Sequence, residues 1–366
     1  MSDWISDETL LTEGYRRCAK LTWRYGTTYF WGAALLPKPQ RKHVHAVYAL
    51  CRLADDIVDL PNGQHPIDTE RDPIPSEPNP PPADPDSPVV EPAPDHTPVE
   101  PETIPTEPDP TLPEPVDSNA SISAQLGGFA EQFRISLAAG DSTDPVMAAV
   151  VHTVITCGID SECFDRFFGA MAMDLTTTSY ETWEDLRSYM EGSAAVIGEM
   201  MLPVLKPISQ EAKAPARSLG LAFQLTNFLR DISEDLDRGR VYLPQDDLQL
   251  FDVDLGRRSV TPEWRAFLAY EIERNRALYS FADTGIGMLP PRSARCVGTA
   301  RVLYAQILDQ IERNDYDVFS RRARVPTLRK AATAARMMVT GPRTLNRQAE
   351  LYQRRSMTDD VTQDTY

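Results

Sequence analysis

The sequence predicts an all-α fold, a single helical bundle domain with a central cavity, and three observations support this prediction. Apolar residues recur at three- and four-residue spacing through most of the chain. We find no convincing alternation of polar and apolar residues over four or more positions, and no internal repeat of solenoid length. Outside one proline-rich segment, enough chain remains to bury a sizeable core.

The helical periodicity predicts ten helices, separated by the Gly, Pro and Asp residues that commonly end or start helices. We assign residues 1–60 and 119–330 to one interrupted helical domain, residues 61–118 to an insertion, and residues 331–366 to a basic C-terminal tail. The predicted helices are 9–25, 40–60, 121–139, 144–157, 161–174, 181–202, 211–237, 261–283, 291–315 and 327–338.

The segment from residue 61 to residue 118 is predicted to be a disordered insertion between two helices. It holds 19 of the 31 prolines and 14 acidic residues against one base, Arg71, and it contains no aromatic residue. Such a composition cannot bury enough apolar surface to offset the entropy lost on ordering. The segment also accounts for most of the net charge of −17, so the folded part is nearly neutral and a nucleic-acid partner is not expected.

The cysteines and the N-terminus predict a cytoplasmic protein. The five cysteines are odd in number and form no CxxC pair, which is typical of reduced thiols. The first fifteen residues are acidic rather than basic and apolar, and no run of ~18 apolar residues occurs. Residues 321–355 carry ten bases against Glu350, which indicates either a solvated helical face or a strip that contacts anionic lipid at the inner face of a membrane.

Two predicted helices carry rows of carboxylates. In the first, residues 43–59, a turn of 100° per residue places Tyr48, Arg52, Asp55 and Asp59 on one narrow strip, and apolar residues cover nearly all of the remaining surface. Asp56 lies beside this strip at the spacing of an ordinary ion pair with Arg52. A helix that is buried on most sides but keeps two acids on its one polar strip is unusual for a solvated surface.

The second helix, within residues 220–244, places Gln224, Asn227, Asp231 and Asp235 on one face. Asn227, Asp231 and Asp235 are four residues apart, so their oxygens rise along the helix at about 6 Å per step. Considered alone, this row fits a solvated acidic surface. If it faced the first strip across a bundle, the two rows would form a cavity for several Mg²⁺ ions and a diphosphate, because Mg²⁺ binds through carboxylates and phosphate oxygens.

Other chemistries have little support in the sequence. There is no phosphate-binding loop of the GxxxxGK[ST] type, and neither GxSxG nor HExxH occurs. The one GxG, at Gly285 and Gly287, runs into Pro290 without a preceding strand. These absences disfavour nucleotide hydrolysis, Rossmann-type cofactor binding, serine esterases and zinc proteases.

The segments YALCRLADDIVD at 48–59 and LGLAFQLTNFLRDISEDLDRGRVYLP at 219–244 resemble the two aspartate-rich signatures of the phytoene and squalene synthase family. The resemblance extends to 25–37, 189–201 and 314–326, and RGRVYLP is most similar to the bacterial phytoene synthase branch. It implies the isoprenoid synthase fold and a prenyl transferase that condenses two geranylgeranyl diphosphates head to head, through a cyclopropylcarbinyl diphosphate, to phytoene in carotenoid biosynthesis. The insertion directly after the first signature departs from the family pattern.

The resemblance also implies roles for individual residues. Mg²⁺, or alternatively Mn²⁺, is expected on Asp55, Asp59, Asn227, Asp231 and Asp235, with Tyr48 among the catalytic residues, and no nicotinamide is expected. Diphosphate binding is expected from Arg52, Arg230, Tyr25, Thr28 and Gln224, with Asp174 as a weaker candidate. The residues expected to line a hydrocarbon tunnel are Ala194, Ile197, Gly198, Leu221 and Leu225. The residues expected to exclude water are Phe30, Trp31, Phe223 and Phe228.

Alternatives remain open at this point. The same residues suit a squalene or dehydrosqualene synthase that uses two farnesyl diphosphates, since one sequence does not show the depth of a tunnel. A non-catalytic prenyl-binding or assembly protein would also have this fold, although such a protein should have lost some of the acids. The expected partners are prenyl diphosphates and a membrane surface that receives the product, and the protein is expected to be a monomer.

We predict that deleting residues 63–117 leaves turnover in vitro unchanged, because the segment lacks the apolar residues needed to pack on the folded domain. The rate of product formation by purified full-length and shortened proteins checks this. A large loss of turnover in the shortened protein would assign the insertion a role in the reaction.

Overall fold

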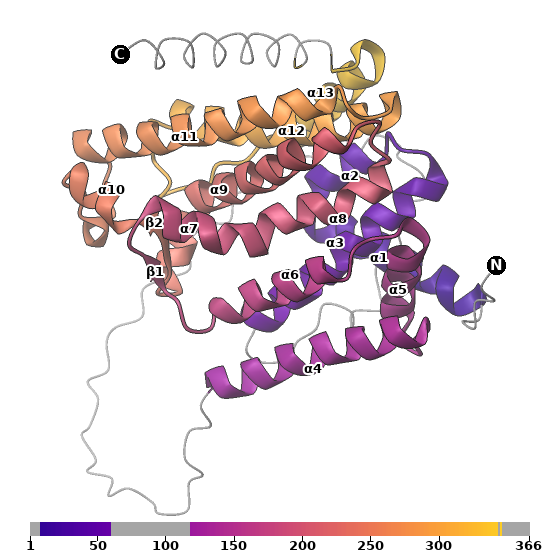
Figure 1. Cartoon of the computed structure of the whole chain (residues 1–366). Coiled ribbons are helices and arrows are strands. Elements are labelled where there is room, and N and C mark those ends of the chain that lie inside the picture. The colour runs from indigo at the N-terminus through magenta and orange to yellow at the C-terminus, as the bar shows by residue number, and fades with distance from the viewer. Residues whose placement is uncertain (1–7, 60–117, 343–344, 346–366) are drawn as a thin grey trace, which may run out of the picture.

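The computed structural model describes residues 8–59, 118–342 and 345 (Figure 1). The predicted insertion therefore lies outside the described residues, apart from Ser118, which begins a helix. The described chain is almost entirely helical, as predicted. Figure 1 shows its helices stacked in layers, with the helix of residues 118–139 at one side of the bundle and the helices of residues 262–340 at the other.

The N-terminal part consists of three helices. A glycine between the first two lies against the ring of Tyr48 on the third. Between the first two helices, a Cβ atom at Gly26 would lie 2.6 Å from the ring of Tyr48, so only glycine allows this close approach. The third helix is buried on most sides, as its sequence predicted. These helices are α1 (Glu8–Tyr25), α2 (Thr27–Ala33) and α3 (Lys38–Asp59).

The next three helices cover one side of α3. The start of the second is fixed by Asp144, whose side chain accepts a hydrogen bond from the Met147 backbone N–H at 2.7 Å, and by Pro145 in the first turn. Its end is fixed by Gly158 in the left-handed region, with φ of 67°. The three are α4 (Ser118–Ala139), α5 (Pro145–Cys157) and α6 (Glu162–Met173).

The sequence predicted one helix over 181–202, and the structure divides it. Thr182 and Asp185 form a reciprocal capping box at its start. A π-helical turn then widens the backbone at Glu191–Ala195, a feature that often occurs beside functional sites. The helices on either side of this turn are α7 (Trp183–Met190) and α8 (Val196–Leu205).

The central helix α9 (Lys213–Asp237) follows a 3-10 turn at Gln210–Ala212 and packs on α8 through small residues. A Cβ atom at Gly198 would lie 2.2 Å from the Ala216 carbonyl oxygen, and one at Gly220 would lie 2.3 Å from that of Ala194. Backbone therefore meets backbone at both positions.

The described chain has two short strands, which the search for alternating segments of four or more residues did not find. β1 (Ser179–Tyr180) pairs in parallel with β2 (Val241–Pro244), with Ser179 opposite Val241 and Tyr180 opposite Pro244. The pair joins residues some sixty positions apart, so tertiary contacts rather than local alternation create it. After α9 the chain passes through β2, and the later helix at residues 262–286 packs back against α9.

The C-terminal helices complete the bundle. Thr261 caps the long helix α11, and the indole N–H of Trp264 donates to the Tyr316 carbonyl at 2.9 Å, which ties that helix to the segment after α12. The last helix crosses the predicted boundary at residue 330 and packs on α12 and α2. These helices are α10 (Gln245–Leu250), α11 (Pro262–Ile286), α12 (Pro291–Arg313) and α13 (Thr327–Thr340), with a 3-10 turn at Leu255–Arg257.

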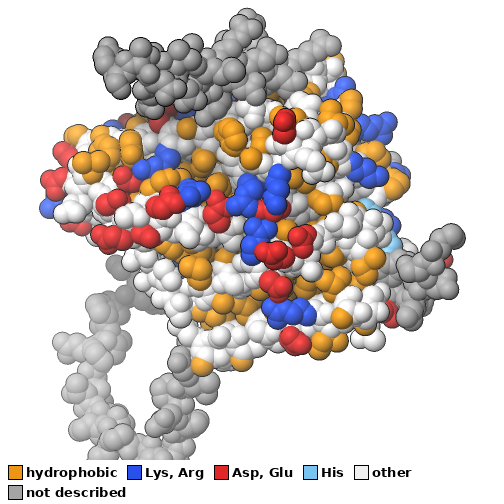
Figure 2. Space-filling model, viewed as in Figure 1, with side chains coloured by type: hydrophobic (Ala, Val, Ile, Leu, Met, Phe, Trp, Pro, Cys, Tyr) orange, Lys and Arg blue, Asp and Glu red, His pale blue; other side chains and the backbone are white. Residues whose placement is uncertain are grey.

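The surface formed by α6, α7 and α8 carries charges of both signs, as Figure 2 shows. Buried Glu199 on α8 lies 3.0 Å from Arg166 and 2.9 Å from Lys213, and it also pairs with Arg217. All five cysteines are free thiols. Within the described ranges, no helix is long and apolar enough to cross a bilayer.

We predict that Gly220→Ala lowers the free energy of unfolding by about 1–3 kcal/mol, because the added methyl group would overlap the Ala194 carbonyl. Urea unfolding measures the change. The control is Gly169→Ala on α6, where nothing lies within 4 Å of the added atom and the residue is exposed. That variant should gain about 0.5–1 kcal/mol from helix propensity, and equal losses in both variants would contradict the close-packing argument.

Candidate active site

A cavity of about 930 Å³ runs through the bundle between α3 and α9. One end is lined mainly by charged side chains from α3, α9 and the segment before α13. The other end is lined by small and apolar side chains from α8, α9, α11 and α12. The cavity thus joins a polar chamber to an apolar tunnel.

The strip predicted on α3 faces this cavity. Tyr48, Arg52, Asp55 and Asp59 all line it. The Asp55 side chain is exposed to cavity space although it lies deep inside the protein, and this burial, together with the neighbouring Asp59, raises the pKa of Asp55 to about 7. Arg52 pairs with Asp56, as the sequence predicted, and leaves Asp55 without a strong counter-ion.

The strip predicted on α9 faces the same cavity from the opposite wall. Gln224, Asn227, Asp231 and Asp235 line it. The Oδ1 atom of Asn227 is buried and has no hydrogen-bond partner among the described residues. Burial and the neighbouring Asp231 raise the pKa of Asp235 to about 7. Each wall therefore carries one carboxylate that its surroundings do not fully compensate.

The other carboxylate on each wall is held by arginines. On α3, Asp59 accepts a hydrogen bond from Arg240 at 2.9 Å, and Arg238 lies 3.5 Å away. On α9, Asp231 accepts hydrogen bonds from Arg230 at 2.7 and 2.5 Å and from Arg322 at 2.8 Å. Burial opposes ionisation of Asp231, but these guanidinium groups hold its pKa below the usual range.

Several of these cations were not identified as site residues from the sequence. Arg322, Arg324 and Lys330 line the polar end of the cavity, and Lys330 donates to the Thr27 hydroxyl on α2 at 2.9 Å. The interpretation of this basic segment as a solvated face or a lipid-binding strip is therefore wrong for these three side chains. Arg322 and Arg324 lie in the segment 314–326, which resembles the family, whereas Lys330 lies beyond it. One sequence does not show that this part of the chain folds back over α9.

Asp174 also faces the polar end of the cavity. It accepts hydrogen bonds from Tyr189 at 2.6 Å and from Tyr242 at 3.0 Å. Burial raises its pKa, although both phenols and Arg240 favour the charged form. Asp174 is thus held rigidly beside Asp55 and Asp59.

The segment between α1 and α3 covers the polar end. Tyr25 and Thr28 line the cavity, and the guanidinium of Arg52 lies over the Tyr25 ring at 4.7 Å from its centroid. The predicted diphosphate-binding residues Arg52, Arg230, Tyr25, Thr28 and Gln224 are therefore all brought to one cavity.

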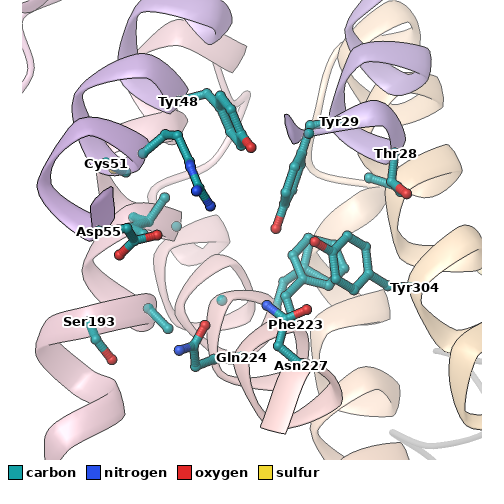
Figure 3. A pocket seen from close by; sticks show the side chains of 18 of the residues that line it. Thr28, Tyr29, Tyr48, Cys51, Asp55, Ser193, Phe223, Gln224, Asn227 and Tyr304 are labelled. Carbon is teal, nitrogen blue, oxygen red and sulfur yellow. The ribbon is translucent and has the colours of Figure 1, made fainter. Parts of the chain in front are cut away.

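Aromatic side chains form the boundary between the two ends. Figure 3 shows Tyr48 on one wall, Tyr29 and Tyr304 on the other, and Phe223 beside Asn227. The ring of Tyr29 lies 5.6 Å from that of Tyr48 and 5.3 Å from that of Tyr304, and Phe223 lies 4.4 Å from Tyr304. Tyr29 and Tyr304 were not predicted as site residues. Tyr29 lies in the segment 25–37, which resembles the family, but the sequence of α12 contains no motif that points to Tyr304.

The tunnel differs in part from the prediction. Ala194, Ile197 and Gly198 line the apolar end. Leu221 and Leu225 do not: α9 turns 100° per residue, which points them into the core on the far side of the helix. The residues of α9 that do line the tunnel are Pro215, Ala216, Leu219, Gly220 and Phe223.

For two of the four aromatic residues expected to exclude water, the prediction is wrong. Phe223 and Phe228 line the cavity, whereas Phe30 and Trp31 do not. Phe30 stacks on His45 at 5.6 Å, and Trp31 packs against the C-terminal half of the core. Because α2 is a helix, its successive side chains point in different directions, and Tyr29 rather than Phe30 or Trp31 reaches the cavity.

The donors suit a hard cation. They are carboxylate and amide oxygens, including the unpartnered Oδ1 of Asn227. Among the described residues no histidine lines the cavity, and burial raises the pKa of the two cysteines that do, Cys51 and Cys296, which keeps them as neutral thiols. In the part of the chain that the structure describes, no three His, Cys, Asp or Glu side chains are grouped closely enough to hold one ion by themselves. Each wall therefore offers one or two oxygens to an ion rather than a complete shell.

A family model, curated relatives and a solved structure all match this chain to squalene or phytoene synthases. The family model described as squalene/phytoene synthase matches residues 23–73 and 111–329. The chain is 31% identical to phytoene synthase of Arthrospira platensis over 87% of this chain and 90% of that protein, and 31% identical to 15-cis-phytoene synthase of Synechococcus elongatus over 87% and 91%. The fold is similar to that of squalene synthase HpnC from Alicyclobacillus acidocaldarius, with a TM-score of 0.62, 25% identity, and coverage of 85% and 97%.

We predict that the metal-free protein loses stability as the pH rises from about 4 to about 7, in part because of Asp55. The folded protein keeps the Asp55 proton over this range, whereas the unfolded chain, with an ordinary pKa, releases it. Asp55→Asn removes this contribution, so its free energy of unfolding in EDTA should exceed that of the wild type by more at pH 8 than at pH 5.

Urea unfolding at the two pH values checks this prediction. The control is Gln249→Asn at an exposed position of α10, which changes no titratable group, so its difference from wild type should be the same at both pH values. If Asp55→Asn showed no dependence on pH relative to wild type, the carboxyl group would not be held neutral in the folded protein.

Proposed function

Because the chain belongs to the squalene/phytoene synthase family, we propose that it is a phytoene synthase, a transferase that joins two geranylgeranyl diphosphates head to head. We name phytoene as the product because two relatives named phytoene synthase are 31% identical to this chain over most of their length. In the overall reaction two diphosphates and two protons leave the substrates, so no reductant is required.

The observation that carries the proposal is the pairing of two oxygen rows across one cavity that continues into an apolar tunnel. A prenyl diphosphate has the same division, with a charged head and an apolar chain. The polar end can hold the heads of the substrates while the tunnel takes their chains. A solvated acidic surface would explain neither the shared cavity nor the tunnel.

Divalent cations fit the acids of the polar end. Asp55 and Asp59 on α3 would hold them on one wall, and Asn227, Asp231 and Asp235 on α9 would hold them on the other. Since neither wall forms a complete shell, we expect diphosphate oxygens to supply further ligands, as Mg²⁺ sites commonly require. When bound, Mg²⁺ would neutralise the diphosphate charge and make it a better leaving group.

In this proposal the arginines of the site first pair with the acids and then bind the diphosphates. In the described structure they neutralise the acids, since Arg230 and Arg322 hold Asp231, and Arg240 holds Asp59. When cations occupy the carboxylates, the same guanidinium groups can turn to the diphosphate oxygens, together with Arg52 and Lys330. Guanidinium groups bind such oxygens in a fixed bidentate geometry.

The apolar end is long enough for a C20 chain. Along α9 its lining extends from Asn227 to Pro215, about 18 Å at 1.5 Å per residue, and it continues past the start of the helix to Ala212. Three bonds of an extended chain span about 3.5 Å, so the roughly sixteen bonds of a geranylgeranyl chain span about 19 Å and the roughly twelve of a farnesyl chain about 14 Å. A farnesyl chain would therefore fill less of this length.

The aromatic side chains and the tunnel protect the reaction. Loss of diphosphate leaves an allylic cation, and water would convert it to an alcohol. Tyr29, Tyr48, Phe223 and Tyr304 place ring faces and edges where this cation would form, and aromatic faces attract cations without reacting as water does. The apolar tunnel beyond them keeps water away from the second alkyl chain.

The proposal is tested by incubating the purified protein with Mg²⁺ and either geranylgeranyl or farnesyl diphosphate, with and without NADPH. We expect phytoene from the C20 substrate alone, with no effect of NADPH. Squalene or dehydrosqualene as the main product would assign the chain to the C15 branch. Absence of any hydrocarbon would favour a non-catalytic prenyl-binding protein.

We expect Asp55→Ala and Asp231→Ala to reduce kcat by at least about a hundredfold at saturating Mg²⁺ while circular dichroism and thermal unfolding show a folded protein. The matched control is Asp237→Ala, which removes an exposed acid on α9 that pairs with Arg258 outside the cavity. Wild-type turnover in either cavity variant would refute the metal assignment.

A further inference from the structure

The outer face of α13 is apolar. Leu328 and Val339 each expose 83% of their surface and Met338 exposes 59%, whereas most large apolar side chains of this bundle are buried. Leu328, Ala332, Ala335 and Val339 follow one another at spacings of three and four residues, so they form one row along the helix. The opposite side of α13 packs on α12 and α2, with Thr333, Ala334 and Met337 buried. The helix therefore has an apolar face toward the protein and a second one toward solvent.

Basic side chains border this row. Arg329 and Arg336, seven residues apart, are both exposed along one edge of it. From residue 318 to residue 342 the chain has six bases and no acid. This differs from the surface of α6, α7 and α8, where acids and bases are intermixed (Figure 2). A row of exposed apolar side chains on a helix whose charged residues are all basic is typical of helices that lie in the interface of a bilayer.

We propose that α13 docks on an anionic lipid bilayer, with Leu328, Val339 and Met338 inserted among the lipid chains and Arg329 and Arg336 at the headgroups. The charge of the surface selects this occupant. Anionic headgroups would attract the two guanidinium groups, and the apolar row would gain from leaving water. The helix lies parallel to the membrane, since it is too short and too polar on its flanks to span it.

The same helix connects this surface to the cavity. Lys330 lies on the protein side of α13, lines the polar end and donates to Thr27 on α2. A bilayer on the outer face would thus lie one helix diameter, about 10 Å, from the residues that cover the site. This arrangement places the cavity beside a phase that dissolves apolar molecules.

Binding to vesicles tests the proposal without substrate, so its outcome is independent of the proposed reaction. Full-length protein is mixed with vesicles of equal parts phosphatidylglycerol and phosphatidylcholine, or of phosphatidylcholine alone, and the bound fraction is measured by co-sedimentation. We expect binding to the anionic vesicles that weakens as salt is added, and at least tenfold weaker binding to the neutral ones.

Variants locate the surface. Leu328→Glu/Val339→Glu should weaken binding to anionic vesicles at least tenfold, because two inserted side chains become charged. The matched control is Ile208→Glu/Leu250→Glu, which places the same two charges at apolar side chains that are each 73% exposed elsewhere, and it should bind as the wild type does. Arg329→Gln and Arg336→Gln should each cost about fivefold.

Several results would overturn the proposal. They are a wild-type protein that stays in the supernatant, an apolar-row variant that binds as tightly as the wild type, and a control pair that loses as much as the test pair. Sedimentation velocity adds another arm: if wild type formed dimers that Leu328→Glu/Val339→Glu abolished, the face would belong to a second copy rather than to lipid.

Discussion

Like charges confined in one cavity are the constraint on which the rest of this structure depends. Carboxylates from α3 and α9 face each other in a chamber where neighbouring acids and low polarity make full ionisation costly. The protein meets this cost in two ways. Arg230, Arg240 and Arg322 hold one acid on each wall, and the remaining acid on each wall keeps a raised pKa. Under the proposed function, cations would occupy these acids and release the arginines for the diphosphate groups of the substrates.

The packing of the bundle serves this chamber. Glycines at 198 and 220 bring α8 and α9 into backbone contact, and the π-helical turn before α8 places Ala194 at the tunnel wall. Small residues leave the tunnel open, while the large side chains of the two core clusters close the bundle around it. Stability therefore comes from the periphery of the cavity rather than from its centre, as expected of an enzyme that must accept long apolar chains.

Residues 321–340 contribute to three different parts of the structure. Arg322 and Arg324 near the start of this segment reach the polar end of the cavity, Lys330 ties α13 to α2, and the outer row of α13 remains exposed. A single charge count over 321–355 could not separate these contributions, because neighbouring bases on a bent segment face different surroundings. Position in the fold, rather than composition, places each base at the cavity, against another helix or on the surface.

The sequence by itself determined the all-α class and both oxygen rows, because a helical period of 3.6 residues sets which side chains share a face regardless of tertiary contacts. It also identified the residues around Tyr48, Asp55, Asn227 and Asp231. Only the tertiary structure decided which face of α9 borders the tunnel, so Leu221 and Leu225 proved to be core residues. It alone paired β1 with β2, brought Tyr304 and Arg322 to the site, and left α13 open on one side. Those outcomes depend on contacts between distant segments, which local periodicity does not encode.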